Sequence, residues 1–76
     1  MMTRLPVVKP KDAICALEAA GFVLHHIRGS HHYFKHPNNP TQRVTVPVHK
    51  RDLKPGTLYR VIKDAGLTVE EFLKLL

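Results

Sequence analysis

The dipeptide Gly29-Ser30 constrains the fold of this chain more than any other stretch, because it separates two short segments of strand-forming residues. Residues 22–28 contain phenylalanine, valine and isoleucine, and residues 31–36 contain tyrosine and phenylalanine. Aromatic and β-branched residues favour strands. A two-residue turn with glycine in its first central position joins antiparallel strands. We therefore predict a β-hairpin with Gly29-Ser30 at its tip.

The return strand of this hairpin, residues 31–36, is expected to have an apolar face and a polar face, because side chains alternate along a strand. Phe34 is its most apolar residue, so the face of Phe34 should cover the helices. His32 shares that face and is expected to be a structural, partly buried residue. The outward face should then hold His31, Tyr33 and Lys35. The pattern thus separates two histidines that are adjacent in the sequence.

The segment before the hairpin predicts a helix over residues 10–20. Pro10 suits the first helical position, where its missing N–H is not needed, and Gly21 suits the position after the helix end. Apolar residues recur between them at helical spacing. We expect Cys15 to be a small core residue of this helix and residues 1–9 to be a loosely held lead-in.

The segments after the hairpin predict one strand and two helices. The sequence Pro-Asn-Asn-Pro at residues 37–40 predicts a turn, and residues 43–47 alternate as a third strand. Pro55 opens a helix that ends before Gly66, and Thr68 begins a capping-box pattern that opens a short last helix. The order α-β-β-β-α plus this short helix predicts an α+β fold, a three-stranded antiparallel sheet with helices packed on one face.

Length and charge limit the kind of site that the chain can carry. A chain of 76 residues is expected to form a single domain, residues 1–76, with a modest core and a shallow site. Its formal charge of +6 favours a polyanionic partner, with nucleic acid first, although it also fits a basic protein without one. The basic segment 49–54, which includes Lys50, Arg51 and Lys54, is expected to contact phosphates together with the start of the next helix.

Cysteine use and hydropathy bear on the compartment. Cys15 is the only cysteine, which excludes an internal disulfide and a cysteine zinc cluster. A small domain without disulfides indicates a reducing environment, so we expect a cytoplasmic protein. The first ten residues lack the apolar core of a signal peptide, and no run approaches the roughly 20 apolar residues of a membrane span. No membrane association is expected.

Four segments occur together in an order and spacing that point to a family. They are Ala20-Gly21-Phe22, Gly29-Ser30-His31-His32, Val44-Thr45-Val46-Pro47 and Leu53-Lys54-Pro55-Gly56-Thr57-Leu58. With these segments the chain resembles the HicA-type toxin family of bacterial and archaeal toxin–antitoxin pairs, also described as YcfA-like proteins. The resemblance runs from about residue 10 to the end of the chain.

The resemblance implies a fold, an activity and a partner. The implied fold is similar to that of double-stranded-RNA-binding domains. The implied activity is that of an mRNA interferase, which cleaves mRNA independently of the ribosome and halts translation. The implied partner is a cognate HicB-type antitoxin that covers the active face. The functional histidine of the family is the first one after Gly-Ser, which is His31 in this sequence.

A histidine at the hairpin tip suits ribonuclease chemistry that needs no metal or other cofactor. RNA carries its own nucleophile, the 2′-OH, and an imidazole titrates near neutral pH, so His31 is expected to act as general acid or base. Lys35 would offer positive charge from the same face, and the N–H groups of Gly29 and Ser30 would bind a phosphate oxygen. Tyr33 would either stack on a base or pack on the sheet.

The same residues admit other interpretations. A zinc site would have to use His31, His32, His36 and His49. Alternation splits the first two, and the motif contains no carboxylate or cysteine, so we expect no metal. Ser30 has no evident acidic partner for a nucleophilic triad. The pair His25-His26 is expected to form a solvated strand face, although one of the two could approach the tip as a second proton-transfer group.

Two other functions would explain the same charge and sheet. One is a non-catalytic RNA-binding module with the same fold, and the other is a protein–protein adaptor whose basic face meets an acidic partner. They differ from the enzyme at His31, because binding alone needs no imidazole there and glutamine or lysine would serve. Loss of RNA cleavage in a His31→Ala variant therefore separates them.

Overall fold

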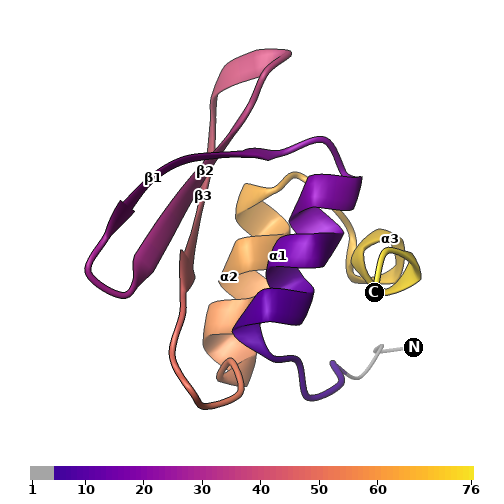
Figure 1. Ribbon diagram of the computed structural model, residues 1–76. Coiled ribbons are helices and arrows are strands. Elements are labelled where there is room, and N and C mark those ends of the chain that lie inside the picture. The colour runs from indigo at the N-terminus through magenta and orange to yellow at the C-terminus, as the bar shows by residue number, and fades with distance from the viewer. Residues whose placement is uncertain (1–4) are drawn as a thin grey trace.

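The computed structural model describes residues 5–76 and contains three helices and three strands in that range (Figure 1). In chain order these are α1 Pro10–Ala19, β1 Val23–Arg28, β2 His31–His36, β3 Asn39–Pro47, α2 Pro55–Asp64 and α3 Val69–Lys74. The strands form one antiparallel sheet in the order β1-β2-β3. The predicted α+β fold with a three-stranded antiparallel sheet is confirmed.

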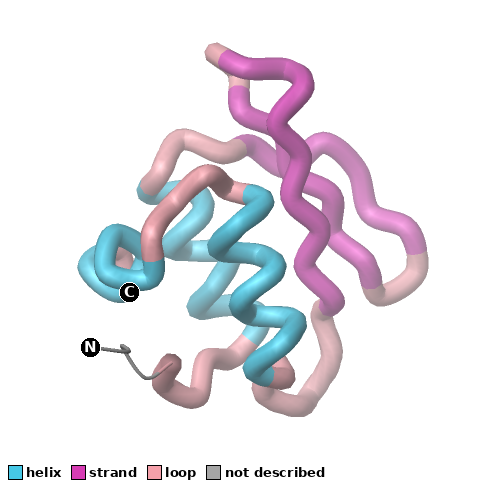
Figure 2. Tube along the Cα trace, turned by 180° about the vertical axis from the view of Figure 1, so that it is seen from behind, coloured by secondary structure: helices cyan, strands magenta, loops and turns pink. Residues whose placement is uncertain are grey.

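The helices lie together on one side of the sheet, and the core fills the space between the two layers (Figures 1 and 2). The sheet buries Phe34, Val44 and Val46 in this core. The largest helical side chains buried with them are Leu17, Leu58, Val61 and Phe72. Helices α1 and α2 pack mainly on β3, whereas β1 is exposed along its whole length. The sheet therefore extends beyond the helix layer on its β1 side.

The hairpin of β1 and β2 has the predicted tip. Gly29 has a φ of 59°, and within residues 5–76 only glycines have positive φ. Arg28 pairs with His31 across the turn. These are the features of a two-residue hairpin turn with glycine in the first central position. The turn holds His31 at the first position of β2.

The predicted helix ends are confirmed by their caps. Gly21, with a φ of 98°, follows α1, and the N–H of Phe22 donates to the carbonyl of Leu17 at 3.0 Å. At the start of α3, the N–H of Glu71 donates to Oγ1 of Thr68 at 3.1 Å, and the N–H of Thr68 donates to Oε1 of Glu71 at 2.8 Å. This is the reciprocal capping box that the sequence predicts.

One strand boundary was predicted wrongly, and β1 has an irregularity that the sequence did not predict. β3 begins at Asn39 instead of residue 43, because Asn39 pairs with His36, and the predicted turn at 37–40 shrinks to Pro37-Asn38. β1 contains a shift in register between Leu24 and His26, so His25 is an extra residue that forms a bulge. Both features arise from pairing between strands, which local sequence preference does not specify.

The N-terminal region also differs from expectation. Val8 is only 3% exposed, and its carbonyl accepts the N–H of Leu53 at 2.8 Å, so the lead-in is held to the fold at this point. Residues 1–4 of the predicted lead-in lie outside the described residues. Cys15 is exposed, which corrects its assignment to the core. Helix α1 instead buries Ala13, Ala16 and Leu17 in the core.

Candidate functional site

The sheet surface that faces away from the helices carries the residues predicted to point outward. His31, Tyr33 and Lys35 alternate along β2 with Phe34, which is 1% exposed in the core. We name this surface the outer face. Cross-strand pairing and the bulge also place on it Val23, His25, His26 and Arg28 of β1 and Arg43, Thr45 and Pro47 of β3.

His31 is an exposed imidazole at the end of the outer face next to the hairpin tip. Its ring centroid lies 6.5 Å from that of Tyr33, and the two rings are tilted by 42°. The turn at Gly29-Ser30 fixes the backbone in front of it, and Pro47 of β3 pairs with it on the other side. The arrangement gives solvent and large polymers access to the ring while its backbone stays in the sheet.

Arg28 is the cation closest in the sheet to His31, although it was not among the site residues predicted from the sequence. The two residues pair directly across the turn, so their Cα atoms are about 5.5 Å apart and their side chains share a face. Lys35 lies four residues along β2 from His31, about 13 Å away at the rise of a strand. The turn itself could have predicted this pair, because the residue before a two-residue turn lies opposite the residue after it.

The bulge at His25 brings two imidazoles of β1 onto the outer face. The ring of His26 stacks on Tyr33, with centroids 4.4 Å apart and planes 7° from parallel. Nδ1 of His25 lies 2.7 Å from Nδ1 of His26, so an N–H of one ring donates a hydrogen bond to the other ring. Both are exposed, as expected, but His26 lies against Tyr33 instead of approaching the hairpin tip. One face of the Tyr33 ring is therefore already occupied.

Electrostatics on the outer face oppose the charging of His25. The positive charge of Lys35 lowers the pKa of His25 below its ordinary value, with smaller contributions from desolvation, His26 and Arg43. No strand within residues 5–76 contains an aspartate or glutamate that would reverse this effect. The six acidic residues lie on the helices or in the loop before α2, at Asp12, Glu18, Asp52, Asp64, Glu70 and Glu71. The outer face is therefore a positively charged surface without an acidic side chain.

Two other histidines have structural positions. His32 is half-buried, as predicted, and its Nδ1 has no hydrogen-bond partner within residues 5–76. The N–H of Asn38 donates to Nδ1 of His36 at 3.2 Å, so the other ring nitrogen carries the proton and donates to the carbonyl of Ala20 at 3.2 Å. His36 also packs edge-on against Phe22, with centroids 5.1 Å apart. It therefore ties the end of β2 to the end of α1.

The histidines weighed for a zinc site do not gather. Within the described part of the chain, no group of three or more histidine, cysteine, aspartate or glutamate side chains is placed to hold a metal ion. His31 is on the outer face, while His32, half-buried, pairs with the core residue Val46.

The basic loop before α2 lies beside the hairpin tip. The N–H of Val48 donates to the carbonyl of Ser30 at 2.6 Å, which joins the two segments. Lys50, Arg51 and Lys54 are exposed along this loop, and Arg51 and Lys54 line a hollow of about 280 Å³. No side chain caps the start of α2. The site residues predicted from the sequence thus form two neighbouring groups, one on the outer face and one in the loop.

The fold and the site define a class of protein, a small basic α+β domain with a shallow imidazole and cation surface on an open antiparallel sheet. The family model described as HicA toxin of bacterial toxin–antitoxin matches residues 10–67. The chain therefore belongs to the HicA toxin family, and its role is that of the toxin in a toxin–antitoxin pair. A search of curated proteins found no match. None of the helices in residues 5–76 is long and apolar enough to cross a membrane.

Proposed function

We propose that this toxin is an endoribonuclease that cleaves mRNA without a metal ion, with His31 as general acid or base. The observation that supports the proposal is the position of His31, an exposed imidazole on a face that carries cations and no carboxylate. Cleavage of mRNA would stop translation, which fits the role of a toxin. The site of action would be the cytoplasm, where mRNA is translated.

The proposed reaction uses the nucleophile of the RNA itself. The 2′-oxygen attacks the adjacent phosphorus, and the bond from phosphorus to the 5′-oxygen breaks. His31 either removes the proton of the 2′-OH or protonates the leaving 5′-oxygen, and solvent water accepts or supplies the other proton. Arg28, its direct cross-strand neighbour, would stabilise the negative charge that develops on the phosphoryl oxygens.

The remaining predicted residues would position the RNA strand. The N–H groups of Gly29 and Ser30 and the charge of Lys35 would bind phosphates on either side of the cleaved bond. Tyr33 would stack on a base only with the ring face that His26 leaves open.

The loop residues Lys50, Arg51 and Lys54 would contact the same strand farther along, because the bond from Val48 to Ser30 keeps the loop next to the tip. These contacts are nonspecific in sequence and weaken with added salt. The proposal also includes a HicB-type antitoxin as the partner that covers the site, and a likeness of the fold to double-stranded-RNA-binding domains.

The test is RNA cleavage by the purified chain in EDTA, with His31→Ala and His31→Gln variants. We expect both variants to lose cleavage, to keep their circular dichroism spectrum, and to bind RNA within a few-fold of the parent. Cys15→Ser, an exposed change on α1, serves as the matched control and should cleave normally. Cleavage by His31→Ala at the parent's rate would refute the assignment. A parent that binds but does not cleave RNA would favour a non-catalytic RNA-binding module.

A further inference from the structure

β1 is an edge strand with an unusual amount of exposed apolar surface. Six large apolar side chains are exposed within residues 5–76, and three of them belong to this six-residue strand. Val23 is 56% exposed, Leu24 is 42% exposed and Ile27 is 53% exposed. Among the described residues β1 pairs only with β2, so its other edge is free. An exposed apolar edge is a site where another strand pairs.

The hairpin turn determines which backbone groups of β1 point to this free edge. Arg28 and His31 flank a two-residue turn, so they form a hydrogen-bonded pair. Hydrogen-bonded and non-hydrogen-bonded pairs alternate in an antiparallel ladder, so the next pair, Ile27 with His32, is of the second kind. The N–H and C=O of Ile27 therefore point away from β2. They offer a donor and an acceptor to a strand added at this edge.

The two faces of β1 differ in chemistry. Leu24 and Ile27 share the face of Phe34 and His32, on the side of the helices. His25, His26 and Arg28 lie on the outer face, with Val23 at its end beside Lys35. A strand added beside β1 has the same two faces, so a complementary one would alternate apolar residues on the first side with acidic residues on the second.

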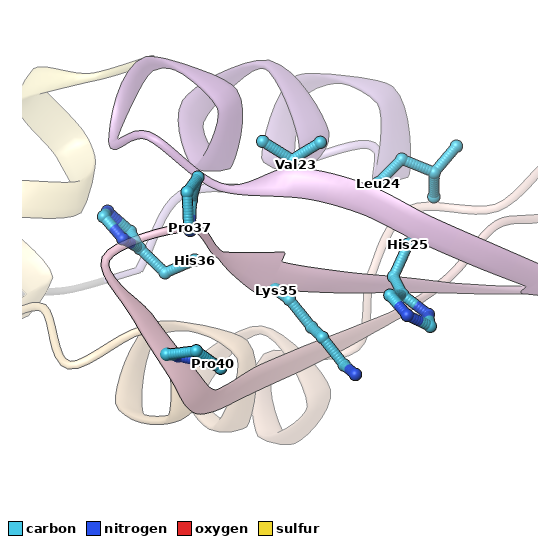
Figure 3. A pocket seen from close by; sticks show the side chains of 7 residues that line it. All are labelled: Val23, Leu24, His25, Lys35, His36, Pro37 and Pro40. Atoms are coloured by element: carbon cyan, nitrogen blue, oxygen red, sulfur yellow. The ribbon is translucent and has the colours of Figure 1, made fainter.

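A shallow apolar pocket adjoins the start of β1 (Figure 3). It encloses about 300 Å³, and its walls include Val23, Leu24, Pro37 and Pro40. His25, Lys35 and His36 complete its lining. Such a pocket accepts one apolar side chain, and pockets of this kind supply side-chain specificity when a peptide strand joins a sheet edge.

We infer that the free edge of β1 binds an extended segment of the antitoxin, with alternating apolar and acidic residues, as a fourth strand of the sheet. The inference rests on the antitoxin partner included in the proposed function, and not on catalysis by His31. A second copy of this chain fits the edge less well. Pairing two β1 strands would place the outer faces of both copies, each with its Arg28, on one continuous surface, and like charges on one surface repel.

The added strand would also act on the proposed active site. It would lie one strand away from β2, directly beside Arg28 and His26. An acidic side chain there would neutralise Arg28 and occupy the approach of a phosphate to His31. The same contact would then hold the complex together and silence the toxin.

The test uses the antitoxin of this toxin–antitoxin pair, purified and titrated against the full chain by calorimetry. We expect Ile27→Glu to weaken the affinity at least tenfold, because it places a charged carboxylate against the apolar residues of the added strand and removes an apolar contact. Val7→Glu is the matched control, since Val7 is an apolar residue that is 78% exposed and lies outside the sheet. It should change the affinity by less than twofold.

Hydrogen exchange provides a second measurement that needs no substitution. In the free chain the amide of Ile27 should exchange quickly, whereas those of His26 and Arg28 are already bonded to β2. The antitoxin should slow exchange at Ile27 at least tenfold. Unchanged exchange at Ile27 with an unchanged affinity of Ile27→Glu would overturn the inference. The inference would also be overturned if the free chain formed a dimer that Ile27→Glu dissociates. It would be overturned too if the Ile27→Glu variant lost RNA cleavage but bound the antitoxin as tightly as the parent.

Discussion

The conformation of Gly29 gives a sharp prediction about the hairpin tip. Its φ of 59° is one that L-amino acids rarely adopt, and a Cβ added there would meet no other atom within 4 Å. The cost of Gly29→Ala is therefore a backbone cost alone, about 1–2 kcal/mol. For a domain of this size each kcal/mol lowers the melting temperature by about 4–8 °C, so we expect a decrease of roughly 4–16 °C.

Gly56 allows the same substitution as a control. It lies in the first turn of α2 without positive φ, and a Cβ there would also meet no atom within 4 Å. Alanine is the better helix former, so Gly56→Ala should stabilise the chain by up to about 1 kcal/mol. The pair isolates the requirement for positive φ, since both substitutions add the same methyl group in open space.

The assay is thermal and urea unfolding followed by circular dichroism, with RNA cleavage measured at a temperature at which both variants are folded. Gly29→Ala should melt below the parent and Gly56→Ala at or above it. Gly29→Ala should also lose cleavage, because a changed turn moves His31 relative to Arg28. If both variants shift the melting temperature in the same direction, the argument from the turn is wrong.

Three further predictions follow from the described contacts. Arg28→Gln should lower kcat/KM for RNA cleavage at least tenfold, about 1.4 kcal/mol in activation free energy, and by more than Lys35→Gln does. Equal effects of the two substitutions in single-turnover assays would contradict the argument that Arg28 pairs with His31. Because the pKa of His25 is lowered in the folded chain, the unfolded chain binds more protons, and the free energy of unfolding should fall as the pH drops through about 6.5. In His25→Gln the urea midpoint should depend less on pH across that range. Hydrogen bonds from Thr68 lower the pKa of Glu71, so the capping box should stabilise the chain above about pH 4.5 and lose this effect as the pH falls below it. Glu71→Gln should remove that acid dependence of the urea midpoint.

Part of the candidate site was predictable because it depends on neighbouring residues in the sequence. Gly29-Ser30 predicts the turn, and alternation from Phe34 predicts that His31 and Tyr33 point outward. Arg28 was missed although the turn alone pairs it with His31. The stacking of His26 on Tyr33 could not be predicted from the alternation of residues, because it requires the bulge at His25. Catalysis by His31 itself stays a prediction until cleavage is measured.

The sequence by itself determined the features that a few adjacent residues control, namely the turn, the caps at Gly21 and Thr68, and the order of the elements. Backbone dihedral preferences and local hydrogen bonds suffice for these. Tertiary structure alone decided the burial of Val8 and the exposure of Cys15 and of all β1. Burial depends on which surfaces meet, and α1 and α2 cover β3 but leave β1 open. That open edge is where we infer that the partner binds.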